Sequence, residues 1–268
     1  MSEILLDVQQ LHFAYGDRVL FHDLSFQVRR GECWVILGAN GAGKTTLLSC
    51  LAGFLSEYEG KILLGDQDIA YMSLLARARC RAFFSSPPLD TFGLSVFDAV
   101  QAGRHPHLSS WQWESEEDET QTREALALFH LEALSRRDIR TLSAGERQRV
   151  ALAALLTQQP SLYLLDEPAA HLDPAQQISA LDTVYAYAKK HHAALVMVMH
   201  EMHLATRYAD HVILLDSEET TQGSAALLNE TALSKLFHTP MIALENDGVK
   251  TFAPSRSQPP DTTLPPRR

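Results

Sequence analysis

The residues with the clearest chemical potential form the stretch GANGAGKT at positions 38–45. Gly38, Gly43, Lys44 and Thr45 match the pattern G-x-x-x-x-G-K-[ST] of a loop whose backbone N–H groups cradle phosphate oxygens. Lys44 is expected to reach the β- and γ-phosphates of a nucleotide, and Thr45 to offer its hydroxyl to Mg²⁺. The alternative is an ordinary glycine-rich turn. The predicted nucleotide-binding residues here are Gly38, Ala39, Asn40, Gly41, Ala42, Gly43, Lys44, Thr45 and Thr46.

Two adjacent carboxylates, Asp166 and Glu167, follow the apolar run LYLL at 162–165. They repel each other unless a cation or a substrate compensates their charge, although a plain turn closed by Pro168 is an alternative. Beside a phosphate loop, Asp166 is predicted to hold the Mg²⁺ shell and Glu167 to orient and polarise the attacking water. Phosphoryl transfer depends on such positioning and charge neutralisation more than on covalent chemistry.

His200 follows the apolar run ALVMVM at 194–199. A histidine at the end of a strand is often structural. At the carboxyl edge of a parallel sheet, however, it would share an edge with the phosphate loop. There it could donate a hydrogen bond to the γ-phosphate and sense its presence. Glu167 and His200 are therefore the predicted catalytic residues.

The stretch TLSAGERQRV at 141–150 combines a helix start with small residues. Ser143 and Glu146 match a capping box, in which each side chain satisfies a free backbone N–H at the start of a helix. That interpretation requires no function. The Ala144-Gly145 pair also suggests that another group approaches the backbone closely.

Apolar runs separated by helical patterns predict the elements that hold these residues in place. The continuous runs at 33–38, 162–167, 194–200 and 211–216 indicate strands buried on both faces, as in a parallel sheet. Helices are predicted from Lys44 and from Asp173, where Pro174 favours the first helical position. Between about 87 and 160 no strand pattern appears, which indicates a helical subdomain inserted in an α/β core. The proline-rich segment 253–268 is predicted to be a disordered tail.

Composition excludes several classes of protein. The chain has 268 residues, 46% of them hydrophobic, which fits one large domain or a domain with a subdomain. Its formal charge of −10 argues against a nucleic-acid partner. Three cysteines without CxxC spacing indicate reduced thiols. The N-terminus does not resemble a signal peptide, and no apolar run approaches the ~18 residues of a membrane span. A membrane role would therefore require a partner.

The order of these motifs resembles the nucleotide-binding subunits of ABC transporters: a phosphate loop, then LSAGE at 142–146, Asp166-Glu167 and His200. The resemblance covers residues 3–245. It implies an α/β, P-loop NTPase core with N-terminal antiparallel strands and an inserted helical subdomain. The segment 246–268 would lie outside that domain.

The family resemblance also assigns residues and partners. The family has a signature sequence, usually LSGGQ, which corresponds to LSAGE at 142–146 here. In the family, two subunits pack head to tail, and the signature of one closes over the γ-phosphate held by the other. It implies ATP and Mg²⁺ as cofactors, a homodimer, and integral-membrane permease subunits, with an external substrate-binding protein acting indirectly. The location implied is peripheral, at the cytoplasmic face of the inner membrane. The nucleotide contacts implied in addition are Tyr15, Ser143, Ala144, Gly145 and Asp173.

Within the family, VQAGRHPHLSSW at 100–111 and HEMHLATRYADHVILLD at 200–216 resemble the subgroup that powers import of iron chelates, haem and cobalamin. A metal site at His105 and His107 is a weaker interpretation than a loop around Pro106. The family's Mg²⁺-contacting glutamine falls on Ser86 here, which makes Ser86 a candidate metal contact and puts coupling in doubt. The alternative function is a soluble, ATP-switched interaction module with weak hydrolysis.

Overall fold

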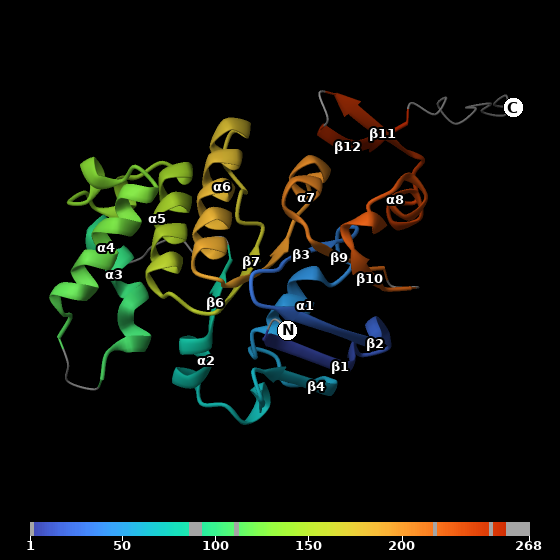
Figure 1. Ribbon diagram of the computed structural model, residues 1–268, viewed down its shortest axis with the longest axis horizontal. Helices are drawn as coiled ribbons and strands as arrows, with labels where there is room; N and C mark the ends of the chain where they lie inside the picture. Colours follow the sequence, from blue (N-terminus) through green and yellow to red (C-terminus); the bar gives the residue numbers. More distant parts are fainter. Residues whose placement is uncertain (1–2, 86–92, 110–112, 217–218, 247–248, 256–268) are drawn as a thin grey trace, which may run out of the picture.

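The computed structural model describes residues 3–85, 93–109, 113–216, 219–246 and 249–255 (Figure 1). The strands are β1 (Ile4–Tyr15), β2 (Arg18–Arg29), β3 (Cys33–Leu37), β4 (Glu59–Leu64), β5 (Gln67–Asp68), β6 (Arg81–Phe84), β7 (Leu162–Asp166), β8 (Ala194–Val198), β9 (His211–Leu214), β10 (Thr221–Ser224), β11 (Met241–Asn246) and β12 (Val249–Pro254). The α-helices are α1 (Lys44–Leu51), α2 (Leu74–Cys80), α3 (Val96–Gln101), α4 (Glu116–Leu128), α5 (Ala144–Thr157), α6 (Pro174–Lys190), α7 (Met202–Tyr208) and α8 (Glu230–Phe237). The 3₁₀ turns are η1 (Ile69–Tyr71), η2 (Ala102–His107), η3 (Glu132–Leu134), η4 (Ile139–Thr141) and η5 (Ala225–Leu227).

The central sheet has the strand order β10-β9-β3-β8-β7-β6, and all its pairings are parallel except that of β10 with β9. The four strands predicted from continuous apolar runs are β3, β7, β8 and β9, so those predictions are confirmed. Each ends one or two residues before the predicted limit. The carboxyl ends of β3, β7 and β8 therefore lie at one edge of the sheet.

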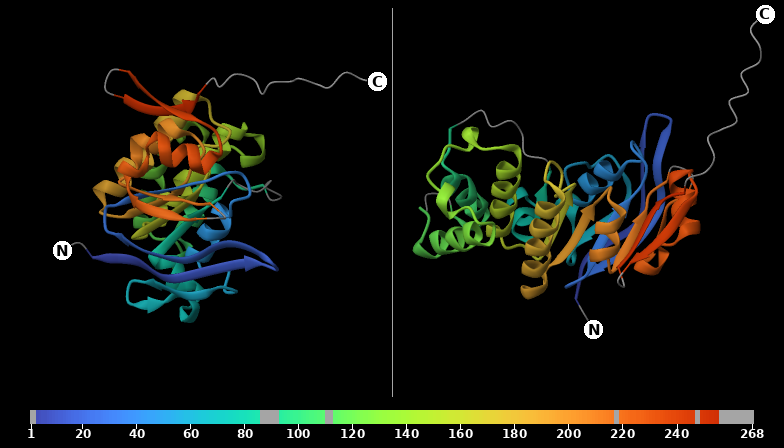
Figure 2. Two further views of the ribbon diagram at one scale, coloured as in Figure 1. Left: turned by 90° about the vertical axis from the view of Figure 1, so that its right-hand side faces the viewer. Right: turned by 90° about the horizontal axis from the view of Figure 1, so that it is seen from above.

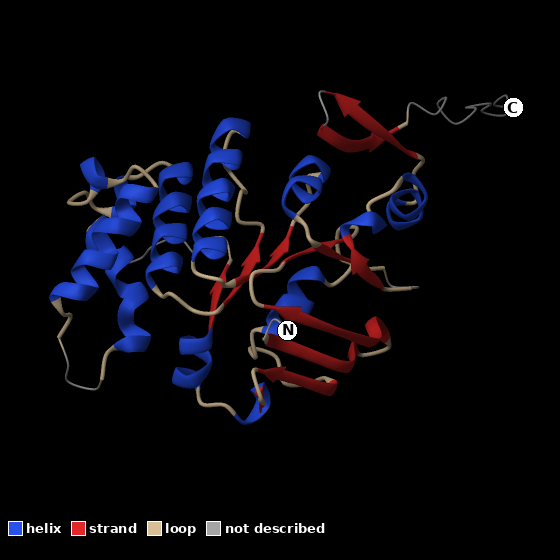
Figure 3. Cartoon of the chain, in the orientation of Figure 1, coloured by secondary structure: helices blue, strands red, loops and turns tan. Residues whose placement is uncertain are grey.

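Alternation along the strands divides the apolar core into two layers. Trp34 and Ile36 of β3 face one layer, together with α1 and the N-terminal strands. Cys33, Val35 and Leu37 face the other layer, which includes side chains of α5, α6 and α7. Figure 3 shows the sheet running between these two sets of elements. Both faces are covered, which explains why these strands are apolar at nearly every position.

A second sheet of four strands, in the order β2-β1-β4-β5, is antiparallel. Its long strands β1 and β2 alternate between buried and exposed side chains along much of their length, because one face packs on the core and the other meets solvent. The predicted N-terminal antiparallel strands are thus confirmed. Strand β1 of this sheet ends at Tyr15, which lines the cleft described below.

Helices occupy the described part of the predicted insertion between 87 and 160. It contains α3, α4 and α5 with the turns η2, η3 and η4, and no named strand lies within that described part. The helices form a cluster to one side of the sheets, which the view from above shows most clearly (Figure 2). Capping boxes at Ser115 and Ser143 start α4 and α5. The predicted α/β core with an inserted helical part is confirmed.

The C-terminal part of the described chain adds α8 and the hairpin β11–β12, whose strand β12 packs against α7. The domain limit predicted at residue 245 falls inside β11. Most of the tail predicted to be disordered, from residue 256 onward, lies outside the described residues. No helix in the described ranges has the length and apolar character needed to cross a membrane.

Candidate nucleotide-binding and hydrolysis site

The predicted phosphate loop connects β3, which ends at Leu37, to α1, which begins at Lys44. Gly41 and Gly43 adopt φ angles of 76° and 97°, which other residues rarely tolerate, so glycine is required for this turn. A Cβ at Gly43 would also lie 3.1 Å from Leu20 Cδ1. The first N–H groups of a helix have no partner within the helix, so the start of α1 beside this loop suits a phosphate group.

Lys44 is buried and folds back over this loop. Its Nζ donates hydrogen bonds to the carbonyl oxygens of Gly38 and Ala39, at 2.9 and 3.0 Å. Burial lowers the pKa of Lys44, and the nearby carboxylates of Glu167 and Asp166 raise it in part. The ammonium group is thus positioned beside the place where the loop would hold phosphates.

A cleft of about 360 Å³ lies over the loop and brings together residues from distant parts of the chain. Tyr15 stands at its rim, more than half exposed, with its ring edge-on to Phe13 at 4.9 Å between centroids. Such an exposed aromatic face suits a nucleotide base. The residues that line the cleft are Tyr15, Arg18, Leu20, Asn40, Gly41, Gly43, Lys44, Thr45, Thr46, Glu167 and His200.

Asp166, the last residue of β7, is hydrogen-bonded to the first turn of α1. Its Oδ2 accepts a hydrogen bond from Thr45 Oγ1 at 2.8 Å, whereas its buried Oδ1 has no hydrogen-bond partner among the described residues. Burial raises the pKa of Asp166, and the neighbouring Glu167 raises it further, against the hydrogen bond from Thr45. An unpartnered carboxylate oxygen beside a hydroxyl is the hard oxygen donor set that Mg²⁺ prefers. Thr45 and Asp166 therefore fit the predicted metal site.

Glu167 and His200 meet at the carboxyl edge of the sheet, because each follows one of the neighbouring parallel strands β7 and β8. His200 Nε2 lies 2.6 Å from Glu167 Oε1, within a hydrogen bond. The backbone of Glu167 has φ 49°, and its N–H donates to the carbonyl of Val198 at 3.2 Å. The structure thus brings both predicted catalytic side chains into the cleft beside Lys44.

The predicted signature residues lie elsewhere in the chain. Ser143 caps α5, its Oγ accepting from Glu146 N at 3.3 Å, and Glu146 Oε2 accepts from Ser143 N at 2.7 Å. Ser143, Ala144 and Gly145 do not line the cleft over the phosphate loop. A Cβ at Gly145 would lie 3.3 Å from Leu172 Cδ2 and 3.2 Å from Gln176 Oε1. The glycine therefore has a packing reason within its own chain.

Three further candidates also lie apart from the cleft or outside the described residues. Asp173 caps α6 by accepting from Gln176 N at 2.9 Å and does not line the cleft. Ser86 lies outside the described residues. His107 belongs to η2 and its Nε2 lies 2.7 Å from the carbonyl of Gln158. The described residues contain no cluster of three or more histidine, cysteine or acidic side chains suited to a metal.

Arg18 is a cleft residue that the sequence motifs did not indicate. Its Nη2 donates to the carbonyl of Gly41 at 2.8 Å, so the guanidinium lies against the phosphate loop from the neighbouring sheet. The only sequence signal was a basic residue three positions after Tyr15. Arg18 adds a second cation to Lys44 and suits the binding of an anionic ligand.

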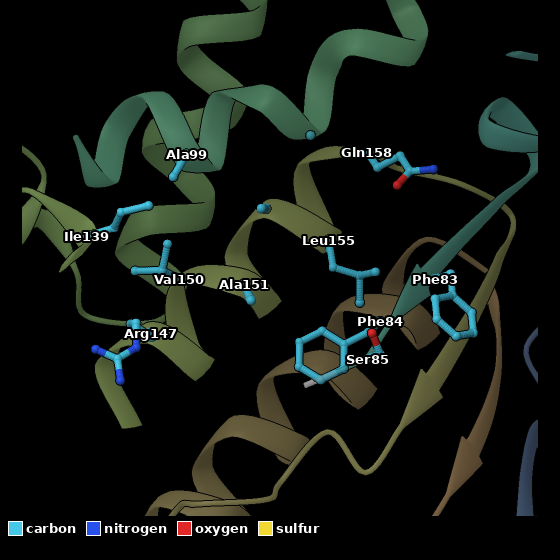
Figure 4. Close-up of a pocket in the computed structure, with 12 residues that line it drawn as sticks. Phe83, Phe84, Ser85, Ala99, Ile139, Arg147, Val150, Ala151, Leu155 and Gln158 are labelled. Carbon is cyan, nitrogen blue, oxygen red and sulfur yellow. The ribbon is translucent and has the colours of Figure 1, made fainter. Parts of the chain in front are cut away.

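A second cavity, of about 410 Å³, lies between the end of β6 and the helices α3 and α5 (Figure 4). Its lining is largely apolar and includes Phe83, Phe84, Val150 and Leu155, with Arg147 at one side. Phe83 contacts the half-exposed Phe54 in a T-shaped arrangement, with ring centroids 4.9 Å apart. This cavity is separate from the nucleotide cleft and shares no lining residue with it.

Comparison with known proteins places this geometry in a family. Residues 21–170 match the family model for the ABC transporter. The petrobactin import ATP-binding protein of Bacillus anthracis is 36% identical over 216 residues, which cover 80% of this chain and 78% of that protein. The achromobactin transport ATP-binding protein of Dickeya dadantii is 34% identical over 247 residues, covering 87% and 92%. The hemin import ATP-binding protein of Pseudomonas entomophila is 38% identical over 217 residues, covering 79% and 83%.

Solved structures give the same result for the fold. A chain of a metal-chelate type ABC transporter in an inward-facing conformation has a TM-score of 0.82 at 28% identity, over 94% of this chain and 98% of that one. A dimeric ATP-binding cassette in a post-hydrolysis state with ADP and Pi has a TM-score of 0.71 at 19% identity, over 82% and 98%, and supports the fold alone. The chain belongs to the ABC transporter family. It is an ATP-binding and ATP-hydrolysing subunit of that family, as the sequence motifs predicted.

Proposed function

We propose that this chain powers a bacterial importer for an iron chelate, haem or cobalamin. It would act as a homodimer docked on permease subunits at the cytoplasmic face of the inner membrane. An external binding protein would deliver the cargo. The observation that carries the ATPase part is the convergence of the phosphate loop, Glu167 and His200 in one cleft, with Asp166 hydrogen-bonded to Thr45 of that cleft. The cargo class is supported by relatives named for petrobactin, achromobactin and hemin.

The geometry of the cleft supports a role for each of these side chains. Lys44 and the N–H groups at the start of α1 bind the phosphates, and Tyr15 offers its ring to the base. Thr45 and Asp166 would hold Mg²⁺, which neutralises phosphate charge when bound. Glu167 polarises the attacking water. His200, whose Nε2 contacts Glu167, would donate a hydrogen bond to the γ-phosphate. When it turns to the phosphate, it releases the carboxylate of Glu167 for the water.

An exposed apolar surface supports a membrane partner. Phe54, Tyr71, Leu74 and Leu75 are between 47% and 89% exposed, far more than most large apolar side chains of this fold. Phe54 contacts Phe83, which lines the second cavity, and α2 packs against β6. Exposed apolar patches of this kind mark contacts with other proteins. We propose that this surface receives a cytoplasmic segment of the permease.

Purification of the tagged chain from membranes of its host tests the partner. A co-purifying polytopic permease is the expected result, whereas a ribosome or a DNA complex would support the interaction module instead. Leu74→Asp should abolish the permease association and leave basal ATPase activity unchanged. Leu128→Asp is the control, because Leu128 is 40% exposed on α4, outside the proposed surface. Retention of the permease by Leu74→Asp would contradict the docking surface.

Uptake assays test the cargo. Cells that lack this gene should lose import of one ferric chelate, haem or cobalamin, and the wild-type chain should restore it. The Glu167→Gln variant should not restore it. Normal uptake of all three cargo classes in the deletion strain would contradict the proposed cargo class.

A further inference from the structure

Gln148, in the second turn of α5, makes an unusual buried contact. Its side chain is 1% exposed, and its Nε2 donates a hydrogen bond to the carbonyl of Pro168 at 2.8 Å. Its Oε1 is also buried and has no hydrogen-bond partner among the described residues. A buried unpaired oxygen opposes folding and offsets what the single hydrogen bond contributes. Packing stability alone therefore gives little reason for an amide at this position.

The group that Gln148 holds is adjacent to the proposed catalytic carboxylate. Pro168 has no N–H, so its carbonyl is its only polar backbone group, and it directly follows Glu167. The backbone of Glu167 is left-handed, with φ 49°, a conformation that is strained for a non-glycine residue. Such a conformation persists only where its surroundings hold it in place.

Other contacts hold the same turn. The N–H of Glu167 donates to Val198 at 3.2 Å, and its carbonyl accepts from Ala170 N at 3.1 Å. Both of these bonds join backbone groups of the α/β core. Gln148 supplies a third bond, and the only one of the three that comes from α5.

We propose that Gln148 is a positioning residue for Glu167, acting through the carbonyl of Pro168. The inference rests on the catalytic role proposed for Glu167. Gln148 does not line the nucleotide cleft, so it sets the geometry of the carboxylate without contacting ATP. The bond also ties the helix that begins at the signature to the turn that carries the catalytic group. Displacements of about 1 Å at a reacting group can lower rates by about 100-fold.

Gln148→Met tests this role because methionine keeps a similar volume and flexibility but cannot donate to Pro168. We expect kcat to fall about tenfold to 100-fold. KM for ATP should stay within about twofold, since no nucleotide contact is removed. Thermal stability should be close to that of the wild type, because the variant also removes the buried unpaired Oε1.

Gln158→Met is the matched control. Gln158 sits at the other end of the same helix, and its Nε2 donates to the carbonyls of Ala78 and Arg81 at 2.6 and 2.9 Å. It lines the second cavity, as Figure 4 shows, and does not line the nucleotide cleft. This control should lose more stability than Gln148→Met, because two bonds disappear, and yet retain its basal kcat.

If Gln148 positions Glu167, Gln148→Met should be the more stable of the two variants and yet have the lower kcat. A purely structural role of Gln148 would not produce these opposite orders. A wild-type kcat in Gln148→Met, or turnover that follows stability in both variants, would overturn the proposal. Glu167→Gln, assayed alongside, separates the two levels of inference. If Glu167→Gln is inactive and Gln148→Met is normal, only the positioning role fails. If Glu167→Gln is itself active, the proposed role of Glu167 fails.

Discussion

Glu167 and His200 share a hydrogen bond of 2.6 Å, so each side chain limits where the other can turn. This contact and the left-handed backbone of Glu167 fix one carboxylate oxygen before any water is engaged. Glu167 lines the cleft, whereas Asp166 is not among the residues that line it. At the scale of single residues, the arrangement favours Glu167 over Asp166 as the group that polarises water, since Asp166 is committed to Thr45.

Glu167→Gln should therefore retain ATP binding and lose turnover. The amide keeps the shape and one hydrogen-bonding oxygen but cannot accept a proton, and loss of a positioned base costs about 10²–10⁴-fold in rate. Steady-state ATPase assays should show a fall of at least about 100-fold, with an ATP-bound dimer accumulating in gel filtration.

The neighbouring acid provides the control. Glu201 follows His200 and does not line the nucleotide cleft, so Glu201→Gln should keep most of the turnover. Near-normal turnover in Glu167→Gln would show that another group polarises the water.

The sequence identified those functional residues whose signal lies in the neighbouring positions of the chain. The loop from Gly38 to Thr45 has a fixed spacing, and the acids and the histidine stand directly after continuous apolar runs. Arg18 and Gln148 could not be identified in this way. Arg18 meets Gly41 across 23 positions, and Gln148 meets Pro168 across 20, without any motif to connect them. Which glutamine faces a carbonyl depends on helix packing, which periodicity alone does not specify.

At the scale of elements, the helical cluster contains a buried ion pair that the sequence did not indicate. Arg104 of η2 contacts Asp118 of α4, with Nε and Oδ1 separated by 2.7 Å and both side chains less than 10% exposed. Arg104 also donates to the carbonyl of Thr157 at 2.9 Å. The first turn of α4 carries four acidic residues, and one of them, Asp118, is buried. Its pair with Arg104 links η2, α4 and α5.

This ion pair predicts a specific response to acid. Burial alone would raise the pKa of Asp118, but hydrogen bonds from Ser115 and Arg104 outweigh it and lower the pKa to about 2. An unfolded aspartate titrates near pH ~3.9. A carboxylate whose pKa is lower in the folded state contributes stability that is complete above the unfolded value and is lost as pH falls towards the folded value. The contribution of Asp118 should therefore disappear between about pH 4 and pH 2.

Urea unfolding of Asp118→Asn measures this contribution. The variant should be less stable than the wild type at neutral pH, and the difference should shrink as the pH falls below about 4. Glu119→Gln is the control, because Glu119 and its partner Arg123 are both at least half exposed and should contribute little at any pH. A stability difference for Asp118→Asn that stays constant from neutral pH to about pH 2 would contradict the assigned charge state.

At the scale of the whole molecule, the chain keeps its two sets of predicted nucleotide contacts apart. The phosphate loop, Glu167 and His200 line one cleft, whereas Ser143, Ala144 and Gly145 start a helix of the helical cluster and do not line it. The sequence order showed both sets, but only the fold shows that one chain does not join them. A second copy could supply the missing contacts, as the family resemblance predicts. The close packing of Gly145 on Leu172 means that its variants need a test of folding as well as of activity.

Complementation between two inactive variants distinguishes these arrangements. Lys44→Ala removes the phosphate contact, and Gly145→Asp obstructs the signature, so each homodimer should hydrolyse little ATP. If the signature acts on the partner's nucleotide, a mixed dimer retains one site with an intact loop from one chain and an intact signature from the other. Random mixing makes about half of the dimers mixed, so the mixture should recover at most about a quarter of wild-type turnover.

The measurement is ATPase activity of the co-refolded or co-expressed mixture, compared with each variant alone at equal total concentration. ATP binding by the Gly145→Asp monomer, followed by nucleotide fluorescence, must persist, because its own phosphate loop is unchanged. Circular dichroism of the same sample shows whether the variant keeps its secondary structure. If this variant binds ATP and is folded but the mixture stays inactive, the signature serves the nucleotide of its own chain. The cleft and α5 would then have to close on each other within one subunit, rather than across a head-to-tail dimer.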